Sequence, residues 1–299
     1  MNNAICQNEQ IVSMYHSSTS PTPMYPDKLE SMVIAYSSTS RLPVIISSAQ
    51  MFKVEKLLLL NIVNDMSFRD NGFFKNNFLP WPSPQAAIES LYIARSENPF
   101  EWELLRTYFD SNRLKTIHIT EITLKTYVLD STSVLMSFRG VVSFSVTYSN
   151  LRVISGNTFQ KMPNLRMLNL RNNSITDFRV NVRLNQLWSL DLSSNRLMYF
   201  YNQTFINLPF LKRLNLNNNL FTTLDSLQSV LPNLSELQMT GNQFLCSSIC
   251  SIYGKKVPKF ILNAKCKLYN YTTHEGLDHS LSNKAVIDSC RKNGLLASG

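Results

Sequence analysis

Five cysteines are the residues of this sequence best suited to covalent cross-linking or metal binding. Four of them lie near the C-terminus: Cys246, Cys250, Cys266 and Cys290. Such a group forms two disulfides, with three alternative connectivities, or a zinc site that includes His274 and His279. A CxxxC pair followed by single cysteines 16 and 40 residues after Cys250 is not a close zinc-ligand spacing. We therefore expect disulfides and no metal.

The four histidines do not complete any catalytic motif. The sequence has no Ser-His-Asp arrangement, phosphate-binding loop, HExxH or CxxC motif. His118 alternates with Thr116 and Thr120, which predicts a surface side chain that titrates near neutral pH. We therefore expect a non-enzymatic protein that uses no cofactor.

The net charge of +9 comes partly from a short basic stretch. Five lysines fall within it: Lys255, Lys256, Lys259, Lys265 and Lys267. A solvated surface explains them, and contact with an anionic glycan or membrane surface is the alternative. Because basic and aromatic residues do not interleave in a nucleic-acid-binding pattern, we expect no DNA or RNA partner.

Four N-glycosylation sequons, together with the cysteines, indicate an extracellular protein. They begin at Asn172, Asn202, Asn233 and Asn270. The longest apolar run, Val54 to Val63, contains charged and polar residues, so no segment is apolar enough for a transmembrane helix. The N-terminus lacks the apolar stretch of a signal peptide. We therefore expect a secreted protein whose leader is not part of this sequence.

A repeated pattern of apolar residues accounts for most of the chain. Four stretches fit the template LxxLxLxxNxL closely, and they start at Leu165, Leu187, Leu211 and Leu234. Five weaker copies precede them, starting at Leu29, Val54, Ile88, Leu114 and Val141. Most of the spacings lie near the 20–29 residues typical of leucine-rich repeats. We expect residues 1–28 to be the remnant of an N-terminal cap, 29–245 to hold about nine repeats and 246–299 to form a cysteine-rich C-terminal cap and tail.

The repeat predicts an α/β solenoid, a leucine-rich-repeat horseshoe with a parallel sheet on its concave face. The central LxL of each copy is expected to be a short strand whose outer apolar residues point inward, and stacked coils bury them together. In the return segments, Phe159, Met162, Phe205 and Leu208 should also point inward. Only the last four repeats carry the template Asn, whose amide bonds to the backbone: Asn173, Asn195, Asn219 and Asn242. We expect these repeats to be regular and the earlier ones to be irregular.

The largest spacing, 34 residues after Val54, predicts an insertion that contains NGFFKNNFLPWPSPQ. Its prolines, with Trp81 between two of them, indicate a rigid extended loop. The loop either packs on its own aromatic residues or binds a ligand through Trp81. Cys6, the unpaired fifth cysteine, is a cap remnant, a free thiol or a bridge to a dimer partner.

The chain resembles two groups of leucine-rich-repeat proteins. The four regular repeats, with NTF and QTF in their return segments, resemble the extracellular arrays of Toll-type receptors. The stretch LESMVIAYSSTSRLPVIISSAQMFKVEKLLLLNI and the cap CSSICSIYGKKVP…AKCKLYNYTTHEGL resemble those of dipteran leucine-rich-repeat immune proteins. The resemblance implies a secreted recognition protein of insect innate immunity, with a disulfide-bonded cap that pairs Cys246 with Cys266 and Cys250 with Cys290.

The middle residues of the predicted strands indicate where a ligand binds. In the first four repeats they are apolar or aromatic-like, and in the last five they are polar: Val33, Leu58, Tyr92, His118, Ser145, Asn169, Asp191, Asn215 and Gln238. An exposed apolar patch often marks an interaction site. We therefore expect a protein or glycan ligand to contact Leu58, Tyr92, His118 and Tyr148. The alternative is that the weaker repeats are out of register and some of these side chains are buried.

Two other functions fit the same scaffold. One is the ectodomain of a Toll-like or adhesion receptor whose membrane segment is missing from this sequence. The other is an extracellular matrix or developmental scaffold without a soluble ligand. A repeat scaffold does not reveal its specificity, because the outward residues vary freely while the core pattern stays.

Overall fold

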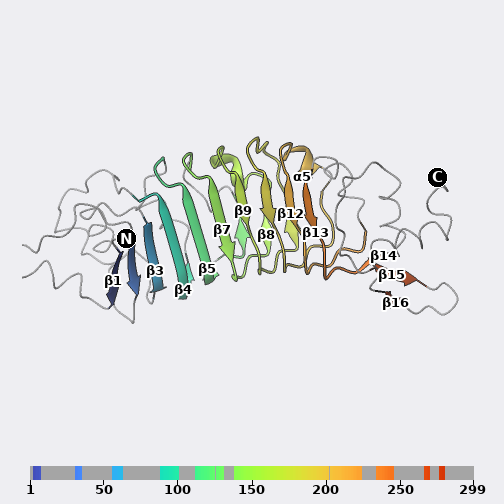
Figure 1. Ribbon diagram of the computed structural model, residues 1–299, viewed down its shortest axis with the longest axis horizontal. Helices are drawn as coiled ribbons and strands as arrows, with labels where there is room; N and C mark the ends of the chain where they lie inside the picture. The colour runs from blue at the N-terminus through green and yellow to red at the C-terminus, as the bar shows by residue number, and fades with distance from the viewer. Residues whose placement is uncertain are drawn as a thin grey trace, which may run out of the picture. The chain divides into compact units, whose positions relative to one another are not determined.

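The computed structural model describes residues 3–7, 31–35, 56–62, 88–100, 112–124, 126–130, 138–201, 203–223, 234–245, 266–269 and 276–279. The chain divides into two compact units. Unit 1 comprises Met1–Tyr127 and Thr132–Asn150, and unit 2 comprises Val128–Ser131 and Leu151–Gly299. Both are parallel β-solenoids, in which each turn of chain adds one strand to a sheet (Figure 1).

Six strands of unit 1 pair in parallel, in the order β1-β2-β3-β4-β5-β7. They are β1 (Asn3–Gln7), β2 (Ser31–Ala35), β3 (Lys56–Ile62), β4 (Ser90–Phe100), β5 (Thr116–Leu124) and β7 (Ser143–Thr147). Each of the last five begins two residues after the start of a template match. β1 is an additional parallel strand, within the segment expected to be the remnant of a cap.

Unit 2 contains a sheet of four short parallel strands, in the order β9-β11-β12-β13. They are β9 (Met167–Asn169), β11 (Ser189–Asp191), β12 (Arg213–Asn215) and β13 (Glu236–Gln238). A second parallel sheet joins β6 (Val128–Leu129), β8 (Val153–Ile154) and β10 (Asp177–Phe178). A third joins β14 (Phe244–Leu245), β15 (Cys266–Tyr269) and β16 (Gly276–His279).

The core of each unit consists of the inward residues of the strands and of the return segments. Two short helices lie in those segments, η1 (Thr158–Lys161) and α5 (Gln203–Ile206). The four return residues expected to point inward are at most 4% exposed: Phe159, Met162, Phe205 and Leu208. The prediction of buried return residues is therefore confirmed.

The predicted Asn column bonds to the backbone in unit 2. Nδ2 of Asn195 donates to the carbonyl oxygens of Leu170 and Leu192, at 2.9 and 3.0 Å, and Oδ1 accepts from the N–H of Ile175 at 3.0 Å. Asn173, Asn219 and Asn242 make equivalent bonds with their own neighbours. These bonds satisfy polar backbone groups at the bend that follows each strand.

The longest strands lie in repeats that lack the template Asn. β4 and β5 have 11 and 9 residues, whereas β9 has 3. Ser96 and Ile122 occupy the template position, and they face each other in the strand register. We attribute the longer strands to this change, because without a side-chain amide the backbone groups pair between strands instead. The horseshoe curvature and the disulfide-bonded cap remain predictions, since the described part of unit 2 includes only the backbone of β15 around Cys266.

Candidate ligand-binding face

The outward side of β4, β5 and β7 carries most of the residues expected to bind a ligand. The inward residues of these strands are 0% exposed: Leu91, Ile93, Ile117, Ile119, Phe144 and Val146. Since side chains alternate along a strand, Tyr92, His118 and Ser145 point to the opposite side. The register pairs Tyr92 with His118 and His118 with Ser145, so these three residues form one row across the sheet.

Tyr92 and His118 are in contact within this row. Their ring centroids are 5.7 Å apart and their planes are tilted by 36°. Burial lowers the pKa of His118 below its ordinary value of 6.5. The imidazole is therefore neutral at physiological pH, and it offers one hydrogen-bond donor and one acceptor.

Ser145 has the least usual environment of the row. It is 5% exposed, and its Oγ has no hydrogen-bond partner among the residues that the structure describes. The neighbouring outward hydroxyls do pair, because Oγ1 of Thr147 donates to Oγ1 of Thr120 at 2.9 Å. An unpaired buried hydroxyl costs about 1–3 kcal/mol, so Ser145 lowers the stability of this strand.

Charged residues stand at both ends of the face and are paired. Nζ of Lys115 lies 2.7 Å from Oε2 of Glu89, and Nε of Arg95 lies 2.9 Å from Oε2 of Glu121. Both pairs are exposed, so each contributes little to stability. Because each charge is paired with an opposite one, the face carries no net charge from these four residues.

Tyr148 lies directly after β7 and is 54% exposed. Its φ is +49°, in the left-handed region that bulky side chains rarely adopt. Left-handed residues occur at the same repeat position in every described repeat from β4 onward: Arg95, Glu121, Tyr148, Asn172, Ser194, Asn218 and Gly241. The repeat imposes this conformation, and unit 1 fills it with larger residues than the Asn, Ser and Gly of unit 2.

The other two expected ligand-binding residues are less well placed by the structure. The Cα of Leu58 in β3 faces that of Tyr92, which continues the row along the backbone. Trp81 lies outside the described residues. Ser145 stands in the same sequence column as Tyr92 and His118, but its side chain is polar like those of the later repeats, so its burial in the row was not predicted.

The corresponding row in unit 2 is hydrogen-bonded within itself. Asn169, Asp191 and Asn215 each accept from the backbone N–H two residues further on. Nδ2 of Asn215 also donates to Asp191 at 3.3 Å. These side chains stabilise the turns that follow the strands, and a ligand would have to compete with those bonds.

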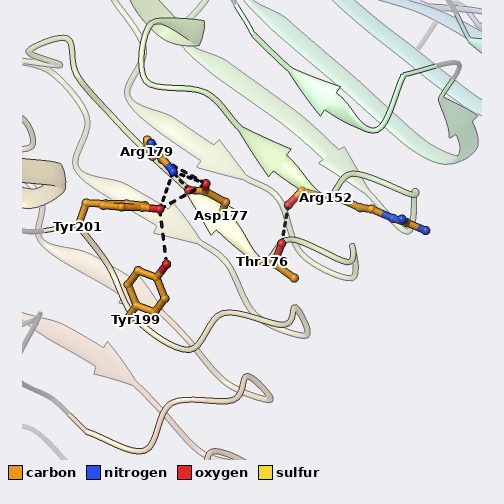
Figure 2. A network of polar contacts seen from close by, with 6 residues as sticks. All are labelled: Arg152, Thr176, Asp177, Arg179, Tyr199 and Tyr201. Carbon is orange, nitrogen blue, oxygen red and sulfur yellow. Dashed lines mark hydrogen bonds and ion pairs between the residues drawn. The ribbon is translucent and has the colours of Figure 1, made fainter.

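Unit 2 contains a second polar cluster, which Figure 2 shows. The Arg179 guanidinium donates to both carboxylate oxygens of Asp177 and to the Tyr201 hydroxyl at 2.6 Å, and it lies 4.1 Å from the Tyr201 ring centroid. The Tyr199 and Tyr201 rings meet edge to face at 5.5 Å. A hydrogen bond with Tyr199 raises the pKa of Tyr201. These groups satisfy one another, so the cluster links β10 to the next turn.

Among the expected glycosylation sites, the structure describes only Asn172. Its φ is +54°, at the turn that follows β9. Asn202, Asn233, Asn270, Cys246, Cys250 and Cys290 lie outside the described residues. Within the described ranges, no group of three or more His, Cys, Asp or Glu side chains is suited to hold a metal ion. No helix in those ranges has the length and apolar character needed to cross a membrane.

Comparison with known proteins agrees with this architecture. Residues 139–197 match the leucine-rich repeat family model. No curated protein sequence matches the chain. An internalin from Listeria monocytogenes, at 17% sequence identity, has the same fold, with a TM-score of 0.55 over 80% of this chain and 62% of that chain. The chain is therefore a parallel β-solenoid that matches the leucine-rich repeat over residues 139–197.

Two further solved structures are similar to this chain. One is a TLR13–ssRNA13 complex, at 16% identity and a TM-score of 0.43, covering 73% of this chain and 39% of that chain. The other is the Drosophila Toll–Spatzle complex, at 14% identity and a TM-score of 0.40, covering 80% of this chain and 37% of that chain. The chain spans less than two thirds of each of the three structures.

Proposed function

We propose that this chain is a non-catalytic recognition module that binds a protein or glycan ligand through the outward face of β4, β5 and β7. One observation carries the proposal. Tyr92 and His118 form an aromatic pair on that face, with ring centroids 5.7 Å apart, whereas the equivalent row of unit 2 is hydrogen-bonded internally. Aromatic side chains are enriched at the energetic centres of interfaces, whereas a ligand of the unit 2 row would have to compete with the bonds within that row.

The order and the composition of the face suit binding. Its side chains project from a hydrogen-bonded sheet over a fully buried core, so little order has to be gained when a ligand arrives. Tyr92 and Tyr148 supply aromatic surface, which is enriched at the energetic centres of interfaces. The neutral row lies between paired charges, as in interfaces where charged residues are depleted at the centre and kept at the rim.

The setting we propose is extracellular, and the process is innate immunity. The sequons, the cysteine group and the resemblance to dipteran immune proteins support both. A glycan at Asn172, on the turn after β9, would hinder access to that side of unit 2 and would favour binding on unit 1.

The test uses the full-length chain with two defined probe sets, a phage-displayed random-peptide library and a glycan array. We expect binders in one set, and we expect Tyr92→Ala combined with Tyr148→Ala to weaken them by about tenfold or more. Tyr199→Ala is the matched control, because Tyr199 is 56% exposed against 54% for Tyr148. Binding that persists within error in the double variant, or that falls equally in the control, would refute the proposed face.

A further inference from the structure

We propose that unit 2 has a second binding site, the surface around the Arg166–Trp188–Lys212 row, and that its ligand is an acidic polysaccharide. The site is separate from the face of β4, β5 and β7. Its ligand carries sulfate or carboxylate groups along a chain of sugar rings. The choice of a glycan among anions rests on the extracellular setting of the proposed function, and the site itself rests on the geometry and charge of unit 2.

The three residues of the row occupy the same position in successive turns, directly before β9, β11 and β12. The backbone N–H of Trp188 donates to the carbonyl oxygen of Arg166 at 3.0 Å, and that of Lys212 donates to the carbonyl oxygen of Trp188 at 2.9 Å. Neighbouring strands lie about 4.8 Å apart, so the backbones of Arg166 and Lys212 are about 10 Å apart. Both cationic side chains are exposed. The sheet therefore presents two positive side chains from backbone positions of fixed spacing.

The row contains no carboxylate, in contrast with the equivalent position in unit 1. There Nζ of Lys115 lies 2.7 Å from Oε2 of Glu89, so the two charges neutralise each other. In unit 2, Nε of Arg166 donates to the uncharged Oε1 of Gln186 at 3.3 Å, and its other N–H groups bond to no described residue. Residues 151–245 contain nine Lys and Arg but four Asp and Glu, so the surrounding field also attracts an anion.

Trp188 orders a third cation beside the row. The Arg213 guanidinium lies 5.1 Å from the centroid of the Trp188 ring, and its Nε lies 3.2 Å from Oε2 of Glu236. The ring and the carboxylate restrict this guanidinium, so less side-chain freedom is lost when a ligand anion bonds to it. Because β13 lies on the opposite side of β12 from β11, Glu236 is outside the stretch between Arg166 and Lys212.

Neutral groups beside the row suit the rings of a sugar chain. Phe210, two residues before Lys212, is 56% exposed and offers an aromatic surface to the C–H groups of a ring. Ser189, directly after Trp188, is half-buried and supplies a hydroxyl. Each sugar hydroxyl needs a hydrogen-bond partner when it is buried, and a serine hydroxyl both donates and accepts. The site therefore has partners for the neutral parts of a glycan as well as for its charges.

Other polyanions match these features less well. A membrane surface is bound by clusters of about four to eight Lys and Arg, more than the row provides. A nucleic acid stacks its bases on aromatic side chains, and the Trp188 ring already holds Arg213. An acidic peptide would have to pair its backbone amides, whereas the strand backbones here are paired with one another. An acidic glycan places neutral rings between its charges, as the row places Trp188 between its cations.

Two predicted glycosylation sites lie at the margins of the site. Asn172 is on the turn that follows β9, at the opposite end of the strand from Arg166. Asn233 precedes Leu234 as Phe210 precedes Leu211, one turn beyond Lys212 in the sequence pattern. A glycan attached at Asn233 would limit the site on that side, so the ligand extends from Lys212 towards Arg166.

The experiment measures binding of the full-length chain to immobilised heparin, which carries sulfate and carboxylate groups. Polygalacturonate, which carries carboxylates alone, distinguishes the two kinds of anion, and neutral dextran is the blank. We expect binding to one or both acidic polymers and none to dextran, and we expect it to weaken as salt is raised. Binding should occur before and after enzymatic removal of N-glycans. Binding only after their removal would show that an attached glycan covers the site.

Substitutions then locate the site. Arg166→Gln combined with Lys212→Gln should weaken binding by about tenfold or more and reduce its salt dependence. The matched control, Arg171→Gln with Arg196→Gln, removes the same charge from two exposed residues beyond the other end of the strands, and should weaken binding less than about threefold. Phe210→Ala should weaken binding about two- to tenfold at every salt concentration. All these side chains are exposed, so the unfolding midpoints should stay close to that of wild type.

Three results would overturn the inference. Equal losses in the two double variants would show a general attraction to positive charge. Full binding in both, with loss in a chain that carries Lys255→Gln, Lys256→Gln and Lys259→Gln, would place the anion on the basic stretch near the C-terminus. Tighter binding to polyglutamate, to single-stranded DNA or to anionic vesicles than to both acidic polymers would show that the ligand is not a glycan.

Tyr92→Ala combined with Tyr148→Ala separates this site from the proposed function. We expect this variant to keep full affinity for the acidic polymer. If no acidic polymer binds but the variant loses its selected ligands, the proposed face is correct and the second site is wrong. If an acidic polymer binds through Arg166 and Lys212 but the variant keeps its selected ligands, the second site is correct and the proposed face is wrong. Loss of polymer binding in the variant would place the glycan on unit 1 and contradict the second site.

Discussion

Thr158 and Thr204 occupy the same position in two return segments, seventeen residues after the start of their repeats, but their hydroxyls differ. Oγ1 of Thr158 donates to the carbonyl oxygen of Leu129 at 2.7 Å. Oγ1 of Thr204 has no partner within the described residues, although the side chain is 1% exposed. The equivalent carbonyl oxygen, that of Val180, accepts from Nδ2 of Asn207 at 2.7 Å instead.

This difference predicts opposite effects for one type of substitution. Thr204→Val keeps the side-chain shape and removes an unpaired hydroxyl, so we expect the free energy of unfolding to rise by about 1 kcal/mol. Thr158→Val removes a buried hydrogen bond and should lower it by about 1–2 kcal/mol. Denaturant titration of both variants tests the pair. Equal effects of the same sign would contradict the assignment.

The buried amide of Asn195 should contribute more to stability than any exposed one. It is 7% exposed, and it bonds to backbone groups of its own turn and of the preceding turn. Asn195→Ala leaves several of these groups unpaired, and we expect a loss of about 2–4 kcal/mol in the free energy of unfolding. Asn185→Ala is the control: its exposed side chain accepts a hydrogen bond from Arg183, and the substitution should cost less than about 0.5 kcal/mol.

The sequence predicted well the features that depend on a repeated apolar pattern. Every template match from Leu29 onward starts two residues before an observed strand. The pattern locates the strands because side chains alternate between the two sides of a strand, so a strand with one buried side has alternating apolar residues. The four template asparagines bond as expected, because their partners are backbone groups, which each turn supplies whatever its side chains are.

Features that depend on single departures from the pattern were missed. Ser149 occupies the template column, but Asn150, one residue later, accepts from the N–H of Leu124 as Asn195 does from that of Ile175, and it donates to the carbonyl oxygen of Leu124. A template aligned by position does not show such a shift. The unpaired hydroxyl of Ser145 was also beyond prediction, because it depends on which neighbouring side chains find partners.

The cysteines and sequons make a prediction that mass spectrometry tests directly. If the four C-terminal cysteines form Cys246–Cys266 and Cys250–Cys290, alkylation before reduction should label Cys6 alone, or no cysteine if Cys6 bridges two chains. Enzymatic deglycosylation of protein from its natural source should lower the mass. Five labelled cysteines and no glycan would contradict an extracellular location.

The lowered pKa of His118 predicts how stability depends on pH. Folding depresses this pKa below 6.5, so the unfolded chain takes up the proton first as pH falls. His118 therefore contributes stability above about pH 6.5, and this contribution is lost as pH falls towards the folded-state pKa. Denaturant midpoints of wild type should decrease over this range more than those of His118→Gln. Identical pH profiles would show that His118 titrates normally.

Tyr148 offers a test that separates stability from binding. An aromatic residue at a φ of +49° is strained, whereas Asn tolerates the left-handed region and fills the equivalent position at Asn172 and Asn218. Because Tyr148 is exposed, its replacement loses little packing. We expect Tyr148→Asn to raise the free energy of unfolding by about 1 kcal/mol and to weaken the selected ligand.

The control for Tyr148→Asn is Ser194→Asn, which places the same side chain at the same repeat position in unit 2, where φ is +55°. It should change stability by less than about 0.5 kcal/mol and leave ligand affinity unchanged. A stabilised Tyr148→Asn variant with full affinity would show that the strain serves no binding role. A destabilised variant would show that the Tyr148 ring packs against the fold, and the loss of affinity could then not be assigned to direct contact.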